Sequence, residues 1–83
     1  MRLEDVNALV EARRVAAREY GRLFGCSMED ALEPVKVRCS SELTDLSRIV
    51  DKPIKRTDFD EGGAYLSVDY QGQRFECVTV VVD

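Results

Sequence analysis

The last twenty residues predict a β-hairpin, because most of them alternate between apolar and polar positions. From Ala64 to Tyr70 an apolar side chain falls on every second residue, which is the period of a half-buried strand. Gly72 permits a tight turn, and a two-residue loop at Gln71 and Gly72 fixes the register of the two strands. The predicted pairs are Val68 with Phe75, Leu66 with Cys77, and Asp69 with Arg74.

Apolar side chains spaced by three and four residues predict one amphipathic helix over residues 3–24. Glu4 and Asp5 in its first turn and Arg22 in its last turn suit the helix dipole, and Gly25 follows as a left-handed cap. We expect the apolar side of this helix to cover one face of the sheet. That side consists of Leu3, Val6, Leu9, Val10, Ala16, Ala17, Tyr20, Leu23 and Phe24.

Shorter elements are predicted between the long helix and the hairpin. In order, they are a short helix over residues 28–32, a strand over residues 35–39, a helix over residues 42–50 and a loop over residues 54–63. Pro34 ends the short helix, and Ser40 or Ser41 caps the next one.

The predicted fold is one α+β domain spanning residues 1–83, with the element order α-α-β-α-β-β. Its sheet is three-stranded and mainly antiparallel. The final strand is placed in the middle of that sheet because residues 78–82 are apolar on both faces. A homodimer formed through an open sheet face is the alternative explanation for the second apolar side.

The composition narrows the possible functions. Charged residues occupy three of the first five positions and no long apolar run follows, so neither a signal peptide nor a membrane span is expected. The chain has no histidine, and Cys26, Cys39 and Cys77 form no C-x-x-C pair, which argues against a zinc site. We interpret the cysteines as buried structural thiols. A cytoplasmic protein without catalytic activity, metal or cofactor is therefore predicted.

The net charge of −4 is unevenly distributed. Residues 57–83 carry six acids and one base, whereas residues 36–56 carry six bases and three acids. An acidic chain disfavours nonspecific binding to nucleic acid or to an anionic membrane. The basic 36–56 segment nevertheless supports an alternative function, a small nucleic-acid-binding or regulatory module, although no stacking motif of the RNA-recognition type accompanies it.

Two acidic segments are the predicted partner-binding sites. In the first, Phe59 stands among Asp58, Asp60 and Glu61 and offers an aromatic anchor inside a charged rim. The second comprises Glu29, Asp30 and Glu33. The spacing from Asp58 to Asp69 loosely resembles a calcium loop, but a glycine at its fifth position and a strand after it argue against calcium.

Arg13 projects from the apolar side of the long helix. One interpretation is that its stem lies along the core while the guanidinium reaches a carbonyl or carboxylate at the edge. The other is an arginine that binds an anion or a partner protein. The first interpretation is favoured, because a single inward arginine is common in small domains.

These observations favour a non-catalytic protein that binds another protein, one with a basic surface. In size and charge the chain resembles phage-encoded inhibitors of host defence enzymes, anti-CRISPR proteins among them. The resemblance concerns no sequence motif. It implies an inhibitor that occupies a basic nucleic-acid groove on its target.

Overall fold

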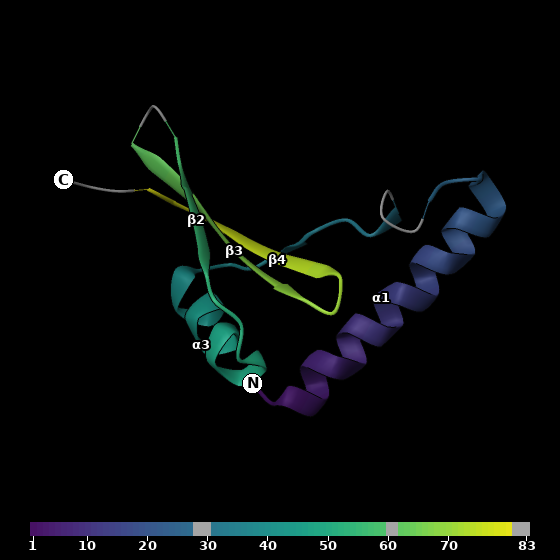
Figure 1. Cartoon of the computed structure of the whole chain (residues 1–83), viewed down its shortest axis with the longest axis horizontal. Coiled ribbons are helices and arrows are strands. Elements are labelled where there is room, and N and C mark those ends of the chain that lie inside the picture. The colour runs from purple at the N-terminus through teal and green to yellow at the C-terminus, as the bar shows by residue number, and fades with distance from the viewer. Residues whose placement is uncertain (28–30, 60–61, 81–83) are drawn as a thin grey trace. The chain divides into compact units, whose positions relative to one another are not determined.

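The computed structural model describes residues 1–27, 31–59 and 62–80. Within these ranges the elements follow in the order α1, β1, α3, β2, β3, β4 (Figure 1). This order confirms the predicted α+β class. The contacts divide the chain into two compact units, Met1–Glu33 and Pro34–Asp83. The single domain over residues 1–83 stays a prediction, and the predicted short helix over residues 28–32 falls largely outside the described residues.

The helix α1 spans Leu3–Phe24, as predicted. Its cap, Gly25, has a φ of 72°, and the Gly25 N–H donates to the Gly21 carbonyl at 2.8 Å. Glycine adopts this left-handed conformation without the steric cost that a side chain brings. That α1 covers the sheet stays a prediction. No helix in the described ranges combines the length and the apolar character needed to cross a membrane.

The hairpin consists of β3, Gly63–Tyr70, and β4, Gln73–Val80. All three predicted residue pairs are confirmed, with Val68 opposite Phe75, Leu66 opposite Cys77, and Asp69 opposite Arg74. The turn residues Gln71 and Gly72 both have positive φ angles, 50° and 80°. Two such residues define the type I′ turn, whose twist matches that of the flanking strands.

The sheet has four strands in the order β1-β4-β3-β2, so the predicted three-stranded sheet is corrected to a mixed, four-stranded one. β4 lies between β1 and β3, as predicted. β1 runs parallel to β4, and the two other pairings are antiparallel. The additional strand, β2, spans Lys55–Asp58 inside the segment predicted to be a loop. All four of its residues are polar and exposed, so no apolar alternation marked it as a strand.

The region between α1 and β2 differs from the prediction in two further respects. β1 contains only Val35–Lys36, although the Val37 N–H still donates to the Glu76 carbonyl at 2.8 Å. α3 begins earlier than predicted and spans Ser40–Val50, with Cys39 rather than a serine in the N-cap position. α3 contacts β3 and β4 and thereby covers one face of the sheet (Figure 1). The core of this unit comprises Leu43, Leu46, Val50, Ala64, Val68, Phe75 and Cys77.

Candidate functional site

The two faces of the sheet differ in burial. Ala64, Val68, Phe75 and Cys77 point toward one face and are buried there. Because neighbouring strand residues point to opposite faces, Tyr65 and Val78 lie on the other one. These two residues are paired across β3 and β4, and their side chains are 37% and 55% exposed. The face away from the core therefore presents large apolar side chains to solvent.

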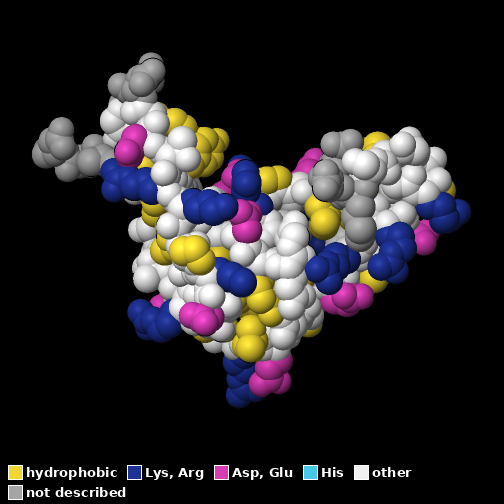
Figure 2. Space-filling model, viewed as in Figure 1, with side chains coloured by type: hydrophobic (Ala, Val, Ile, Leu, Met, Phe, Trp, Pro, Cys, Tyr) yellow, Lys and Arg dark blue, Asp and Glu magenta, His cyan; other side chains and the backbone are white. Residues whose placement is uncertain are grey.

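Phe59 adds a second aromatic ring to this face. Its ring contacts Tyr65 edge-on, with centroids 4.7 Å apart and planes at 78°, and it is 38% exposed. The Phe59 N–H donates to the Gly63 carbonyl at 2.7 Å and extends the pairing of β2 with β3 by one residue. We call Phe59, Tyr65 and Val78 the aromatic patch. Hydrophobic side chains gather beside the tip that joins β2 to β3 (Figure 2).

Gly63 makes room for the Phe59 ring. A Cβ atom at this glycine would lie 2.9 Å from Cδ2 of Phe59 and 3.4 Å from the Thr79 carbonyl oxygen. The first distance is shorter than carbon atoms tolerate, so any larger residue would displace the ring. The absence of a side chain at Gly63 thus helps to hold Phe59 over the backbone next to Tyr65.

The acidic residues predicted around Phe59 are only partly placed by the structure. Asp58 pairs with Ala64 on β3, so its side chain belongs to the face opposite the aromatic patch. There the Asp58 carboxylate accepts a hydrogen bond from Arg56 Nε at 2.7 Å. The predicted positions Asp60 and Glu61 lie outside the described residues. The structure therefore separates Phe59 from Asp58, although the two are adjacent in sequence.

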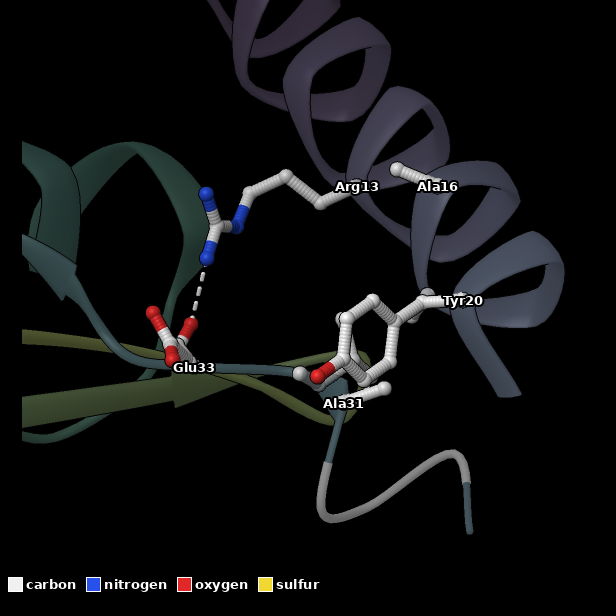
Figure 3. Close-up of a pocket in the computed structure, with 7 residues that line it drawn as sticks. Arg13, Ala16, Tyr20, Ala31 and Glu33 are labelled. Carbon is white, nitrogen blue, oxygen red and sulfur yellow. Dashed lines mark hydrogen bonds between the residues drawn. The ribbon is translucent and has the colours of Figure 1, made fainter. Parts of the chain in front are cut away.

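The second predicted segment contributes only Glu33 to the described residues, since Glu29 and Asp30 lie outside them. Glu33 is exposed, and its backbone carbonyl accepts a hydrogen bond from Arg13 Nη2 at 2.5 Å (Figure 3). This contact agrees with the interpretation that Arg13 reaches a carbonyl at the edge of the core. Arg13 and Tyr20 line a cavity of about 330 Å³ together with Ala16, Ala17, Ala31, Leu32 and Glu33.

The resemblance to a calcium loop does not extend to the geometry. Asp58 faces Ala64, and Asp69 lies five positions further along β3, which corresponds to about 16 Å. The two residues also belong to opposite faces of the sheet. Asp69 accepts hydrogen bonds from Arg74 and Lys55, at 3.1 and 3.3 Å. Burial alone would raise the pKa of Asp69, but these two bonds lower it overall. Within the described ranges, no three potential metal ligands come together.

The basic 36–56 segment has many of its charges paired with acids. Lys36 donates to Glu76, and this hydrogen bond raises the pKa of Lys36. Three further bases pair with acids: Arg38 with Glu42 at 3.3 Å, Lys55 with Asp69 at 3.3 Å, and Arg56 with Asp58 at 2.7 Å. Phosphate groups would have to compete with these carboxylates, which makes the segment a weaker electrostatic site than its composition suggests.

Cys39 differs from the buried structural thiol predicted for it. As the N-cap residue of α3 it is only partly buried, whereas Cys77 is buried as predicted. The Sγ atom of Cys39 lies 3.1 Å from Ser41 Oγ. Hydrogen bonding to Ser41, together with the backbone N–H of Glu42, lowers the pKa of this thiol. A thiolate at a helix N-terminus is also favoured by the helix dipole.

We expect Cys39 to be the most reactive of the three thiols. Because its pKa is lowered, a larger fraction of Cys39 is thiolate at neutral pH, and the thiolate is the nucleophile. Alkylation by iodoacetamide in the folded protein, read by peptide mass spectrometry, should modify Cys39 before Cys26 and Cys77. Ser41→Ala should slow the reaction at Cys39 selectively. Faster labelling of Cys77 would contradict its burial.

Tyr65 and Val78 were missing from the predicted site. The alternation along the hairpin already assigns both to the face opposite Leu66 and Cys77, so the signal was present in the sequence. Their proximity to Phe59 depends on β2, which the sequence did not reveal. Comparisons with family models, curated proteins and solved structures gave no match for this chain.

Proposed function

We propose that this protein is a non-catalytic binding protein, and that the aromatic patch is the centre of the surface that contacts its protein partner. The supporting observation is that Phe59, Tyr65 and Val78 lie together on the open sheet face and are each more than one-third exposed. Aromatic side chains are enriched among the residues that dominate binding energy at interfaces. They supply a large contact area with few rotatable bonds.

The partner is proposed to be a protein with a basic surface around an apolar contact. Phe59 is followed directly by Asp60 and Glu61, and the whole chain carries a net charge of −4. Acidic groups beside an apolar centre accelerate association with a basic partner and make it sensitive to salt. The chain is proposed to act in the cytoplasm. Inhibition of a nucleic-acid-processing defence complex is the narrower hypothesis, and size and charge are its only support.

The decisive experiment compares partner capture by variants with matched surface changes. Tagged wild-type protein, Phe59→Ala and Val15→Ala are used to capture partners from cell lysate, and captured proteins are quantified by mass spectrometry. Val15 is 46% exposed on α1, outside the aromatic patch, and serves as the control. The partner is then purified, and its affinity is measured by calorimetry. Phe59→Ala should weaken binding by about 2 kcal/mol, or about 30-fold.

Gly63→Ala provides an independent variant that removes no apolar atom. The added methyl group should displace the Phe59 ring and weaken binding, while circular dichroism shows a folded protein. An Asp60→Lys, Glu61→Lys double variant should slow association by an order of magnitude or more. Equal affinity of wild type, Phe59→Ala and Gly63→Ala for the purified partner would rule out the aromatic patch as the binding surface.

A further inference from the structure

The cavity of about 330 Å³ beside α1 is formed within one compact unit of the chain. The described residues that line it all belong to Met1–Glu33. Gly21 allows the chain to return close to the helix, because a Cβ atom there would lie 2.7 Å from the Cys26 carbonyl oxygen. After this close approach, residues 31–33 line the cavity together with α1. The two walls therefore come from segments that the backbone holds next to each other.

The cavity has a charged end and an apolar end. At the charged end, Arg13 Nη2 donates to the Glu33 carbonyl at 2.5 Å, and the Glu33 carboxylate belongs to the same residue (Figure 3). Tyr20 and Ala31 lie at the other end (Figure 3). Ala17, which is only 3% exposed, also contributes to the wall. A ligand that fills the cavity thus requires a charged head and an apolar body.

The two opposite charges at one end favour a zwitterionic head group. A guanidinium carries five N–H donors in a planar fork, so Arg13 can hold a carboxylate in addition to the Glu33 carbonyl. A carboxylate such as that of Glu33 accepts charge-assisted hydrogen bonds from an ammonium group. A simple anion would be repelled by Glu33 and a simple cation by Arg13, whereas a zwitterion is attracted by both.

The volume and the apolar end indicate the rest of the ligand. Ligand pockets range over about 300–1,000 Å³, and this cavity lies at the lower end of that range. The Tyr20 ring is 50% exposed, and aromatic rings attract one another in offset or edge-on arrangements. Leu32 adds an aliphatic side chain to the same lining. These properties suit a single small side chain, aliphatic or aromatic.

We propose that this cavity binds a free α-amino acid with an apolar side chain. The carboxylate pairs with Arg13, the ammonium group pairs with Glu33, and the side chain packs against Tyr20. The bond from Arg13 to the Glu33 carbonyl orients the guanidinium for this role. The aromatic patch belongs to residues 34–83, so amino-acid binding and partner binding are separate properties. Each can fail in experiment without affecting the other.

Nuclear magnetic resonance titration of the full chain with L-phenylalanine tests the site. Backbone amide signals of residues 16, 17, 20 and 31–33 should shift together and saturate. Two analogues separate the parts of the head group: hydrocinnamate lacks the ammonium group, and phenethylamine lacks the carboxylate. Each should bind at least about tenfold more weakly than L-phenylalanine, because one charge at the head of the cavity loses its partner. This series uses the wild-type protein, so it does not depend on the folding of any variant.

Charge variants assign each part of the head group to a residue. Arg13→Gln should weaken L-phenylalanine binding about tenfold or more and abolish its advantage over phenethylamine. Glu33→Gln should abolish the advantage over hydrocinnamate. Arg14→Gln is the matched control, because it removes the same charge from a neighbour that is not among the described residues lining the cavity. It should bind like the wild type.

A steric variant tests the cavity itself. Ala16→Leu should fill part of the cavity and abolish binding, while circular dichroism shows a folded helix. Ala12→Leu is its control, since Ala12 is exposed on the same helix and is not among the described residues that line the cavity. It should leave the affinity unchanged.

Three results would overturn the proposal. The first is the absence of saturable shifts at residues 16, 17, 20 and 31–33 with tens of millimolar L-phenylalanine. The second is binding of hydrocinnamate or phenethylamine as tight as that of L-phenylalanine, which would exclude recognition of a zwitterion. The third is equal weakening by Arg13→Gln and Arg14→Gln, which would indicate a general effect of charge and no specific site.

Discussion

Phe75→Ala is expected to destabilise the protein by about 3–5 kcal/mol, which is close to the whole stability of a small domain. Phe75 is only 3% exposed, and it lies in the middle of the sheet between Val68 on β3 and Val35 on β1. Removing its ring would leave a cavity that neighbours on two strands and α3 can fill only in part. Urea denaturation followed by circular dichroism measures the loss.

Val78→Ala is the matched control for this variant, because it truncates a large apolar residue three positions further along the same strand. Val78 is 55% exposed, so the change should cost less than about 1 kcal/mol. Comparing the two variants separates the stability that comes from packing against the core from the stability that comes from strand propensity. Similar urea midpoints for Phe75→Ala and Val78→Ala would contradict the assignment of the two sheet faces.

The register of the hairpin could be predicted because two independent signals agreed. Alternation placed Leu66 and Val68 on one face, and the turn at Gln71 and Gly72 fixed which residues on β4 opposed them. The bounds of α1 were equally well marked, by acids in the first turn and by Gly25 after the last one. In each case local chemistry defined both the element and its ends.

β2 could not be predicted, because its sequence, Lys-Arg-Thr-Asp, has no apolar residue to alternate with polar ones. As an edge strand exposed along its whole length, it is stabilised by pairing with β3 and by charged contacts such as Arg56 with Asp58. Charged edge strands also resist further strand addition, which favours polar residues at such positions. β2 therefore forms because it pairs with β3, and the β-propensity of its own residues gives no indication of a strand.

The structure separates Phe59 from Asp58, one of the acids that the sequence grouped with it. Adjacency in sequence suggested that Asp58 would flank the ring, whereas a strand directs consecutive side chains to opposite faces. Once Lys55–Asp58 is a strand, Asp58 turns toward Arg56 and Phe59 turns toward Tyr65. Because β2 was not predicted, the contact between Phe59 and Tyr65 was not predicted either.

Leu43→Ala is expected to cost about 2–5 kcal/mol of unfolding free energy. Leu43 is completely buried on α3, and α3 packs on the face of β3 and β4 that carries Val68 and Phe75. The expectation follows from the finding that α3 covers this face and supplies Leu43, Leu46 and Val50 to the core. Chemical denaturation should show a lower midpoint with an unchanged slope, which indicates lost stability without a change in the unfolded state.

Asp45→Ala is the control for this prediction, since Asp45 lies on the same helix but is exposed. Replacing it changes the unfolding free energy by no more than about 0.5 kcal/mol, because alanine is an excellent helix former and no core contact is lost. If Leu43→Ala were as mild as Asp45→Ala, α3 could not be the element that closes this face of the sheet. The aromatic patch would then lose its supporting layer, because the strands that present Tyr65 and Val78 are anchored from behind by this core.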